Sequence, residues 1–183
     1  MDFNQITVGI VTFKSENVIF NCLKSIKKIK KIIILDNSND KILKKKIKKK
    51  YPKIKILLSK KNLGYGVANN KIITKSKTPF VFILSPDVIL KKNCEERLLK
   101  SIINLKQDFS ILAPISQYRD YGFLKKNITE TEGVQGFAML INRSKIIKAG
   151  MFDKNIFLYA EELDLCKRLR LNKEKIYINR TAK

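Results

Sequence analysis

The chain alternates short apolar runs rich in β-branched residues with longer segments of helical pattern, and no other sequence feature restricts its fold as strongly. Each run has the length and composition of a strand that is buried on both faces. Strands separated by helices at this spacing are typical of βαβ units. We therefore predict an α/β fold with a mainly parallel sheet flanked by helices, its strands being Gln5–Thr12, Lys31–Asp36, Lys53–Leu58, Phe80–Leu84, Phe109–Ile115 and Val134–Arg143.

The segments between these strands supply the expected helices. Ser15 is a candidate N-cap for a helix whose apolar positions run from Val18 to Ile26. Another helix follows two glycines, Gly64 and Gly66, and an acidic cluster at residues 161–164 begins the last one. Further helices are expected at Lys41–Lys50, Lys92–Lys106 and Ser144–Gly150. The polar stretch Tyr118–Thr131 is predicted to be a loop or lid without a helix.

Length and composition set limits on the class of protein. A chain of 183 residues with 44% hydrophobic residues predicts one globular domain. No apolar run approaches the roughly 20 residues of a membrane span, and the N-terminus resembles a first strand rather than a signal peptide. The three cysteines are widely spaced, and the chain has no histidine to complete a zinc site. We expect reduced thiols and a cytoplasmic protein.

Charge suggests partners but does not choose between them. The 39 lysines and arginines outnumber the 16 acids, which gives a net charge of +23, and the excess is densest in Lys41–Lys61. Nucleic-acid modules usually interleave such a run with arginines or aromatic residues. This run is almost entirely lysine, with Tyr51 as its single aromatic residue. A solvated helix face is therefore favoured, a contact with an anionic membrane comes next, and nucleic-acid binding comes last.

Two aspartates follow buried strands directly. Asp36 ends one predicted strand, and Asp87 lies just beyond another, behind Ser85 and Pro86. Parallel sheets bind ligands at the carboxyl ends of their strands, so both acids are expected to face one crevice. Such an acid can hold a metal, a ribose or a nucleobase, whereas the alternative is a helix cap or a turn. The presence of both acids favours the functional interpretation.

Six motifs in a fixed order cover nearly the whole chain. They are VTFKSEN (11–17), LDNSND (35–40), NLGYGVANN (62–70), LSPDV (84–88), VQGFAML (134–140) and GMFDKNIFLYAEELDLCKRLR (150–170). Their order and spacing resemble the family 2 glycosyltransferases of the Rossmann-like GT-A fold, in particular the rhamnosyltransferase-like branch. The resemblance implies one domain over 1–183, with a nucleotide-binding half at 1–115 and an acceptor-side half at 116–183 that is short at its C-terminus.

The same resemblance implies an enzyme that moves a sugar from a nucleotide-diphosphate sugar to a cell-surface glycan or a lipid-linked acceptor. It implies an inverting transfer assisted by Mg²⁺ or Mn²⁺, with Asp87 on the metal. The donor-binding positions would be Thr12, Phe13, Asn17, Asp36, Asn37, Asn62, Gly64, Gly66, Asn69, Ser85, Pro86 and Asp87. The acceptor-side positions would be Gly136, Phe137, Met139 and Arg168.

The acidic cluster would supply the general base that takes the proton of the acceptor hydroxyl. Glu162 stands where the family usually has aspartate and is the first candidate, followed by Asp164 and then Glu161. Ser85 replaces a common asparagine, and the family's C-terminal histidine has no counterpart. These departures leave a first alternative, a non-catalytic or truncated nucleotide-binding relative. The lysine run leaves a second, a basic nucleic-acid-binding protein. The expected location is cytoplasmic, with a peripheral contact at the inner face of the membrane.

Overall fold

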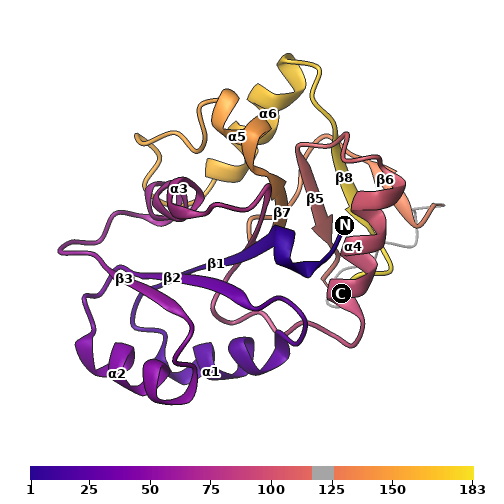
Figure 1. The fold of residues 1–183 in the computed structure, drawn as a ribbon. Coiled ribbons are helices and arrows are strands. Elements are labelled where there is room, and N and C mark those ends of the chain that lie inside the picture. Colours follow the sequence, from indigo (N-terminus) through magenta and orange to yellow (C-terminus); the bar gives the residue numbers. More distant parts are fainter. Residues whose placement is uncertain (117–125) are drawn as a thin grey trace.

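A computed structural model describes residues 1–116 and 126–183, and within them a single sheet forms the centre of the molecule (Figure 1). Its strand order is β3-β2-β1-β4-β7-β5-β8-β6. The strands are β1 (Ile6–Thr12), β2 (Lys31–Asp36), β3 (Lys55–Leu58), β4 (Phe80–Leu84), β5 (Ile111–Pro114), β6 (Ile128–Glu130), β7 (Ala138–Asn142) and β8 (Ile176–Asn179). The helices are a short 3₁₀ turn, η1 (Phe3–Gln5), and α1 (Glu16–Ser25), α2 (Lys41–Lys50), α3 (Tyr65–Lys75), α4 (Cys94–Asn104), α5 (Arg143–Lys148) and α6 (Glu161–Leu171).

The sheet is mainly parallel, as the sequence predicts. β1 pairs in parallel with both β2 and β4, and β2 pairs in parallel with β3. All residues of β1 and β4 are buried, which explains why these strands are continuous apolar runs. β7 is antiparallel to β4 and β5, so the chain reverses direction where its second half joins the sheet.

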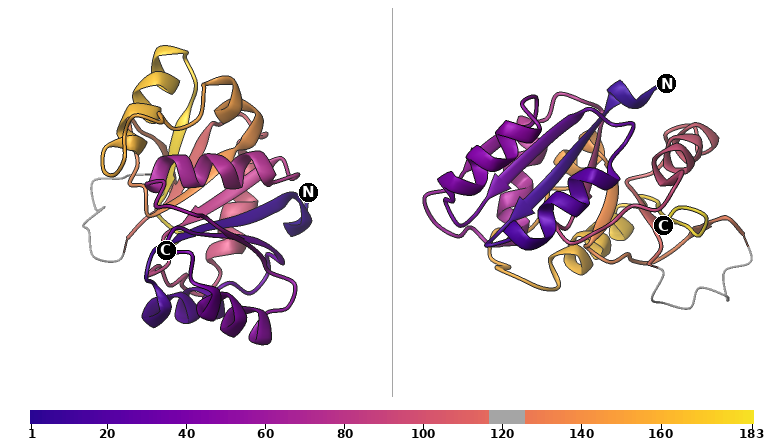
Figure 2. Two further views of the ribbon diagram at one scale, coloured as in Figure 1. Left: turned by 90° about the vertical axis from the view of Figure 1, so that its left-hand side faces the viewer. Right: turned by 90° about the horizontal axis from the view of Figure 1, so that it is seen from below.

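Helices lie over both faces of the sheet (Figures 1 and 2), and each face packs in its own layer of apolar side chains. Ile10 of β1 faces the layer of α1, α2 and α4, whereas the next residue, Val11, faces the layer that includes α3 and α6. This change of face with each residue is the period of two expected of a strand. The sheet therefore lies between helices on both sides, with its carboxyl edge left to the loops.

Two short strands depart from the sequence prediction. β6 lies inside the stretch 118–131 that was predicted to be a loop, and residues 118–125 of that stretch lie outside the described residues. β8 was not predicted. Among the described residues, β6 pairs in antiparallel with β8, which itself pairs in parallel with β5. Both strands are three or four residues long. Their formation depends on pairing between distant segments, which local periodicity does not reveal.

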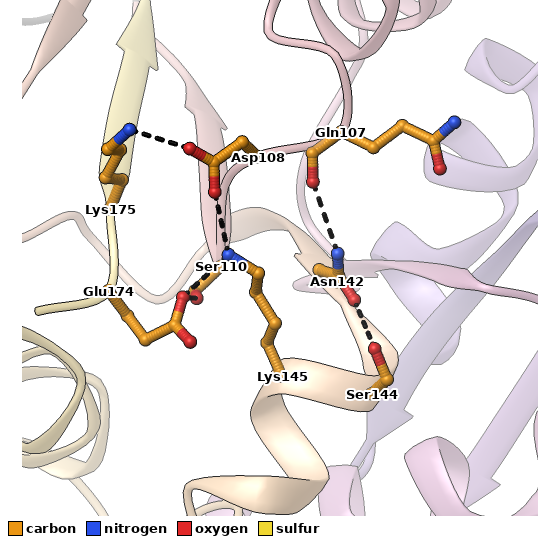
Figure 3. Close-up of polar contacts among 8 residues, drawn as sticks. All are labelled: Gln107, Asp108, Ser110, Asn142, Ser144, Lys145, Glu174 and Lys175. Atoms are coloured by element: carbon orange, nitrogen blue, oxygen red, sulfur yellow. Dashed lines mark hydrogen bonds and ion pairs between the residues drawn. The ribbon is translucent and has the colours of Figure 1, made fainter. Parts of the chain in front are cut away.

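The amino edge of β5 and β8 is held by charged side chains (Figure 3). The Lys145 ammonium lies 2.7 Å from a Glu174 carboxylate oxygen and 3.1 Å from one of Asp108, and Lys175 bonds the other Asp108 oxygen at 2.6 Å. Ser110 donates a hydrogen bond to Glu174. We call Asp108, Lys145, Glu174 and Lys175 the ionic clamp. It ties α5 to the starts of two strands, which is a structural role.

All three cysteines are buried and free. In the described part of the chain, no helix combines the length and the apolar character needed to cross a bilayer.

Candidate active site

The carboxyl ends of β1 and β2 are joined through the Asp36 carboxylate. Thr12 Oγ1 and Ser38 Oγ each donate to Asp36 Oδ1 at 2.8 Å, and the Asp40 backbone N–H donates to Oδ2 at 2.7 Å. Asp36 and Thr12 are almost completely buried. The carboxylate therefore orders the turn after β2, and Phe13 and Asn17 lie exposed beside this turn region, at the end of β1 and on α1.

Asn37 holds the glycine loop against these strand ends. Its Nδ2 donates to the Gly64 carbonyl at 3.1 Å, and its Oδ1 accepts from the Leu63 N–H at 3.3 Å. Its own N–H donates to the Thr12 carbonyl at 2.8 Å. Asn62, whose side chain accepts from the Gly64 N–H at 3.0 Å, completes the loop. Predicted donor residues from β1, β2 and the glycine loop are thus brought together.

Gly64 ends this loop, whereas Gly66 lies in the first turn of α3, which begins directly after Gly64 rather than after both glycines as predicted. Both glycines make room for another part of the protein. Gly64 has φ +75°, and a Cβ there would lie 2.2 Å from the Phe157 carbonyl oxygen. A Cβ on Gly66 would lie 3.0 Å from the Phe152 Cβ. The resemblance to the family implied that these glycines bind the donor. In the structure they admit the segment at 152–157, which leads to the acidic cluster.

Tyr65, between the glycines, is a residue that sequence reasoning did not select. Its hydroxyl donates to the Gly136 carbonyl at 2.6 Å. Burial raises the pKa of this hydroxyl, and the Ser85 and Asn69 side chains contact it. Tyr65 therefore joins α3 to the end of β4 and to the segment before β7. Its position inside the motif, a phenol between two glycines, was the signal that could have identified it.

Glu161 and Glu162 lie next to this junction. The Glu162 Cδ would be 3.5 Å from a Cβ built on Gly136, so its side chain packs against that backbone. Glu161 is 5% exposed, and its Oε2 has no hydrogen-bond partner among the described residues. Burial, with a smaller effect from Glu162, raises the pKa of Glu161. Tyr159 and Ala160, just before α6, both have φ +67°, a costly conformation that is concentrated at functional sites.

Asp164 and Arg168 form a separate unit on α6. Arg168 donates to Asp164 Oδ2 from Nε at 2.9 Å and from Nη2 at 2.7 Å. The same guanidinium donates to the carbonyls of Ala149 and Met151. The Arg168 guanidinium and one oxygen of the Asp164 carboxylate, Oδ2, are therefore engaged, and the guanidinium holds α6 to the turn after α5.

The end of β4 carries the proposed metal ligand. The Ser85 N–H donates to the Phe137 carbonyl at 2.8 Å, and the Val88 N–H donates to the Ser85 carbonyl, which forms a turn containing Pro86. Asp87 projects from this turn with an exposed side chain and forms no ion pair with a described residue. Burial and the nearby Asp87 charge raise the pKa of the Cys22 thiol beneath the turn to about 12.

Three predicted positions prove to be packing residues in part or whole. Met139 is completely buried in the apolar layer next to α3, and Phe137 packs against the opposite layer. Asn69 is buried on α3, where its Nδ2 donates to the Tyr65 carbonyl and its Oδ1 has no partner among the described residues. Within 1–116 and 126–183, no three histidine, cysteine or acidic side chains form a group suited to a metal.

Sequence comparisons relate the chain to a family of known proteins. The model of the family described as glycosyl transferase family 2 matches residues 7–176. The low-salt glycan biosynthesis hexosyltransferase Agl10 of Haloferax volcanii is 24% identical over 194 residues, which cover 91% of this chain and 62% of that protein.

Solved structures share the fold at low sequence identity. The mannosyltransferase PcManGT from Pyrobaculum calidifontis, in complex with GDP-Man and Mn²⁺, superimposes with a TM-score of 0.79 at 13% identity, over 97% of this chain and 58% of that one. Residues 1–349 of TarS from S. aureus give a TM-score of 0.75 at 15% identity, over 99% and 61% of the two chains. The present chain thus spans about three fifths of the length of the relatives it matches.

Proposed function

The chain belongs to glycosyl transferase family 2 and has the GT-A fold, and on that premise we propose that it transfers a sugar from a nucleotide-diphosphate sugar to a hydroxyl acceptor. One observation carries the proposal. Asp36, the glycine loop and Glu162 come from distant segments, yet Asn37 and Tyr65 connect them at the carboxyl edge of one sheet. Asp87 follows β4 at the same edge. This edge is where α/β sheets bind ligands.

The donor would lie across the ends of β1, β2 and β4. The ordered turn at Asp36 and the exposed Phe13 and Asn17 would contact the nucleoside, and the turn at Asp87 would lie near the diphosphate. A solved relative in complex with GDP-Man and another with UDP-GlcNAc support a nucleotide-sugar donor. The hexosyltransferase name of Agl10 supports a hexose, and the rhamnosyltransferase-like motifs support a deoxyhexose.

A divalent cation, Mg²⁺ or Mn²⁺, fits Asp87 as its single protein carboxylate. The side chain is exposed and forms no ion pair with a described residue, so its oxygens are available. Hard cations prefer oxygen ligands, and one or two carboxylates together with substrate phosphates commonly hold Mg²⁺. Relatives solved with Mn²⁺ support this proposal. Such a cation would neutralise charge on the leaving diphosphate.

Glu162 is the proposed general base of an inverting transfer. The acceptor oxygen would attack the anomeric carbon while the bond to the diphosphate breaks, and the hydroxyl proton would pass to the Glu162 carboxylate. Its packing against Gly136 places it beside the proposed acceptor strand. Asp164 is second, because Arg168 already occupies its carboxylate. A cell-surface glycan or a lipid-linked sugar is the acceptor we propose, with the protein in the cytoplasm or peripheral at its membrane.

A thermal-shift screen of nucleotide diphosphates and their sugars, with and without Mn²⁺, tests the donor site. A ligand at 100 times its Kd stabilises a fold by about 2.7 kcal/mol, which is readily measured. We expect a metal-dependent shift with one nucleotide, lost in Asp87→Ala and retained in Glu132→Ala, whose carboxylate is exposed and paired with Arg170.

The outcomes separate the candidate functions. A shift in melting temperature that is the same without Mn²⁺ and in Asp87→Ala would contradict the metal site. The absence of any shift would contradict the donor site. Donor binding without transfer to any acceptor or to water would favour the non-catalytic alternative.

A further inference from the structure

The segment from residue 14 to residue 61 carries most of the excess positive charge. Residues 14–61 contain seventeen lysines and three acids, of which Asp36 is buried in the candidate site. α1 and α2 lie side by side over one face of the sheet (Figures 1 and 2). Lys46 on α2 pairs with Glu16 on α1, and the Lys50 ammonium lies over the Phe20 ring of α1. These contacts hold the two helices in register as one layer.

A cavity extends this layer toward the candidate site. It has a volume of about 600 Å³ and lies between the end of α1 and the segment that leads from β4 into α4. Its lysines are Lys24, Lys27, Lys28, Lys91 and Lys92. The buried acid of this cavity, Glu95, accepts hydrogen bonds from the backbone N–H groups of Lys27, Lys28 and Ile29, and its second acid, Glu96, pairs with Lys28 at 3.8 Å. The five lysines outnumber these two acids, so the cavity favours an anion. We call the outer faces of α1 and α2, together with this cavity, the basic face.

Aliphatic side chains project among these lysines. Ile42 is 66% exposed, Ile89 is 57% exposed and Val18 is 37% exposed. The exposed part of each of these side chains loses the free energy that burial of apolar surface would provide. At a bilayer, the aliphatic group enters the headgroup and acyl boundary while each lysine approaches a lipid phosphate.

We propose that the basic face docks on an anionic lipid bilayer. The alternative polyanion, nucleic acid, fits the surface less well, because such sites combine arginine with exposed aromatic platforms. The first arginine of the chain is Arg97, outside this face. The two aromatic rings of this face, Phe20 and Tyr51, each lie within 6 Å of the Lys50 ammonium, so both already contact a cation of the protein itself.

Charge density on α2 supports the same conclusion. Lys41 and Lys45, and Lys45 and Lys49, are like charges four residues apart on an exposed helix. Such pairs destabilise a helix in water, and lipid phosphates would relieve their repulsion. The proposal does not depend on sugar transfer. Docking would, however, bring the turn of Asp87 close to the bilayer, because Ile89 and Lys91 follow that turn directly.

Vesicle co-sedimentation of the full chain tests the proposal. We expect binding to vesicles of phosphatidylcholine mixed with phosphatidylglycerol, weak binding to phosphatidylcholine alone, and loss of binding at high salt. Lys45→Glu with Lys49→Glu is expected to weaken binding about tenfold or more. The matched control is Lys71→Glu with Lys75→Glu, an exposed pair with the same spacing on α3, over the other face of the sheet.

The aliphatic part of the proposal has its own control. Ile89→Asn should weaken vesicle binding severalfold, whereas Ile103→Asn, equally exposed on α4, should not. Circular dichroism melting confirms that each variant is folded. Equal binding to both vesicle types, or equal losses in the α2 and α3 pairs, would overturn the proposal. So would tighter binding to a single-stranded oligonucleotide that the α2 pair abolishes. Nucleotide-sugar binding in the same variants separates this result from failure of the donor site.

Discussion

Glu161 and Glu162 are neighbours in the sequence, yet the fold gives them different surroundings. Glu161 is buried with one unpartnered oxygen, and burial raises its pKa. Glu162 is partly exposed beside Gly136. Two residues in left-handed conformations precede them and orient this pair. At the scale of single residues, strain and an unsatisfied polar atom are therefore concentrated where the family motif predicts chemistry.

The roles of Glu162 and Asp164 can be separated. Glu162→Gln should lower kcat by a factor of about 100 or more while nucleotide-sugar binding is retained, because only the proton acceptor is lost. Asp164→Asn should mainly lower the melting temperature, since it weakens the contact with Arg168. Steady-state kinetics gives kcat for both variants, and thermal melting gives their melting temperatures. Full activity in Glu162→Gln would remove it as the base.

Gly64 is the residue that tolerates a side chain least. Gly64→Ala should destabilise the fold by roughly 2 kcal/mol or more, because φ is positive and the new Cβ would collide with the Phe157 carbonyl. Gly133→Ala is the control, since its Cβ would meet nothing closer than 3.9 Å. Urea denaturation gives both free energies of unfolding. Equal values for the two variants would show that the 152–157 segment is not held against the loop.

At the scale of elements, the fold relies on a few polar connections between segments far apart in sequence. Glu95 at the start of α4 receives three backbone N–H groups from the turn between α1 and β2. The ionic clamp joins α5 to β5 and β8 (Figure 3). Arg168 joins α6 to the turn after α5. Each connection satisfies backbone groups or charges that packing alone would leave unpaired.

Glu95 should therefore contribute more to the stability of the fold than the next residue, Glu96. Glu95→Ala is expected to cost about 2–3 kcal/mol, because buried N–H groups lose their acceptor. Glu96→Ala should cost less than about 0.5 kcal/mol, since its ion pair with Lys28 is 3.8 Å long and exposed. Chemical denaturation compares the two. A small effect at Glu95 would mean that water replaces its carboxylate without loss.

The ionic clamp predicts a pH-dependent contribution to stability. For Glu174, burial acts to raise the pKa, but hydrogen bonds from Lys145 and Ser110 outweigh it and hold the pKa below the ordinary value of 4.5. For Lys145, burial acts to lower the pKa, but the bonds to Glu174 and Asp108 raise it above 10.5. A lowered acid pKa contributes stability above pH 4.5 that is lost as the pH falls, and a raised lysine pKa contributes stability below pH 10.5 that is lost as the pH rises.

Lys145→Met should accordingly lower the free energy of unfolding by roughly 1 kcal/mol between pH 4.5 and pH 10.5. In acid, where Glu174 is protonated, the difference from wild type should disappear. Lys148→Met is the control on the same helix, because its side chain is exposed and outside the clamp. The test is the free energy of unfolding of wild type and of both variants, measured from neutral pH into acid. A constant difference from wild type at every pH would attribute the effect to packing.

At the scale of the whole molecule, net charge is the dominant feature. A charge of +23 repels itself and destabilises the compact state at low ionic strength. The largest concentration lies on the basic face, away from the ionic clamp, where acids balance the lysines. Stability is therefore expected to respond to salt through this face.

Raising the ionic strength to about 0.15 M shortens the Debye length to ~8 Å and should raise the melting temperature by several degrees. Lys45→Glu with Lys49→Glu removes four units of positive charge and should melt higher than wild type at low salt, with a smaller salt response. A melting temperature that falls with added salt in both proteins would show that ion pairs, rather than repulsion, dominate. Sodium chloride is the appropriate salt, because chloride carries a single charge and screens the lysines without bridging them as a polyanion would.

The amino-acid sequence by itself determined the fold class and the edge of the sheet that carries the candidate site. Continuous apolar runs such as Phe80–Leu84 are read directly from composition and period, and acids after such runs must lie at the carboxyl edge. Only tertiary structure decided that β6 and β8 exist, that Tyr65 bridges to Gly136, and that Arg168 engages Asp164 while Glu162 remains available. The first group depends on patterns within a few neighbouring residues, whereas the second depends on contacts between segments distant in sequence, and only the folded chain brings those together.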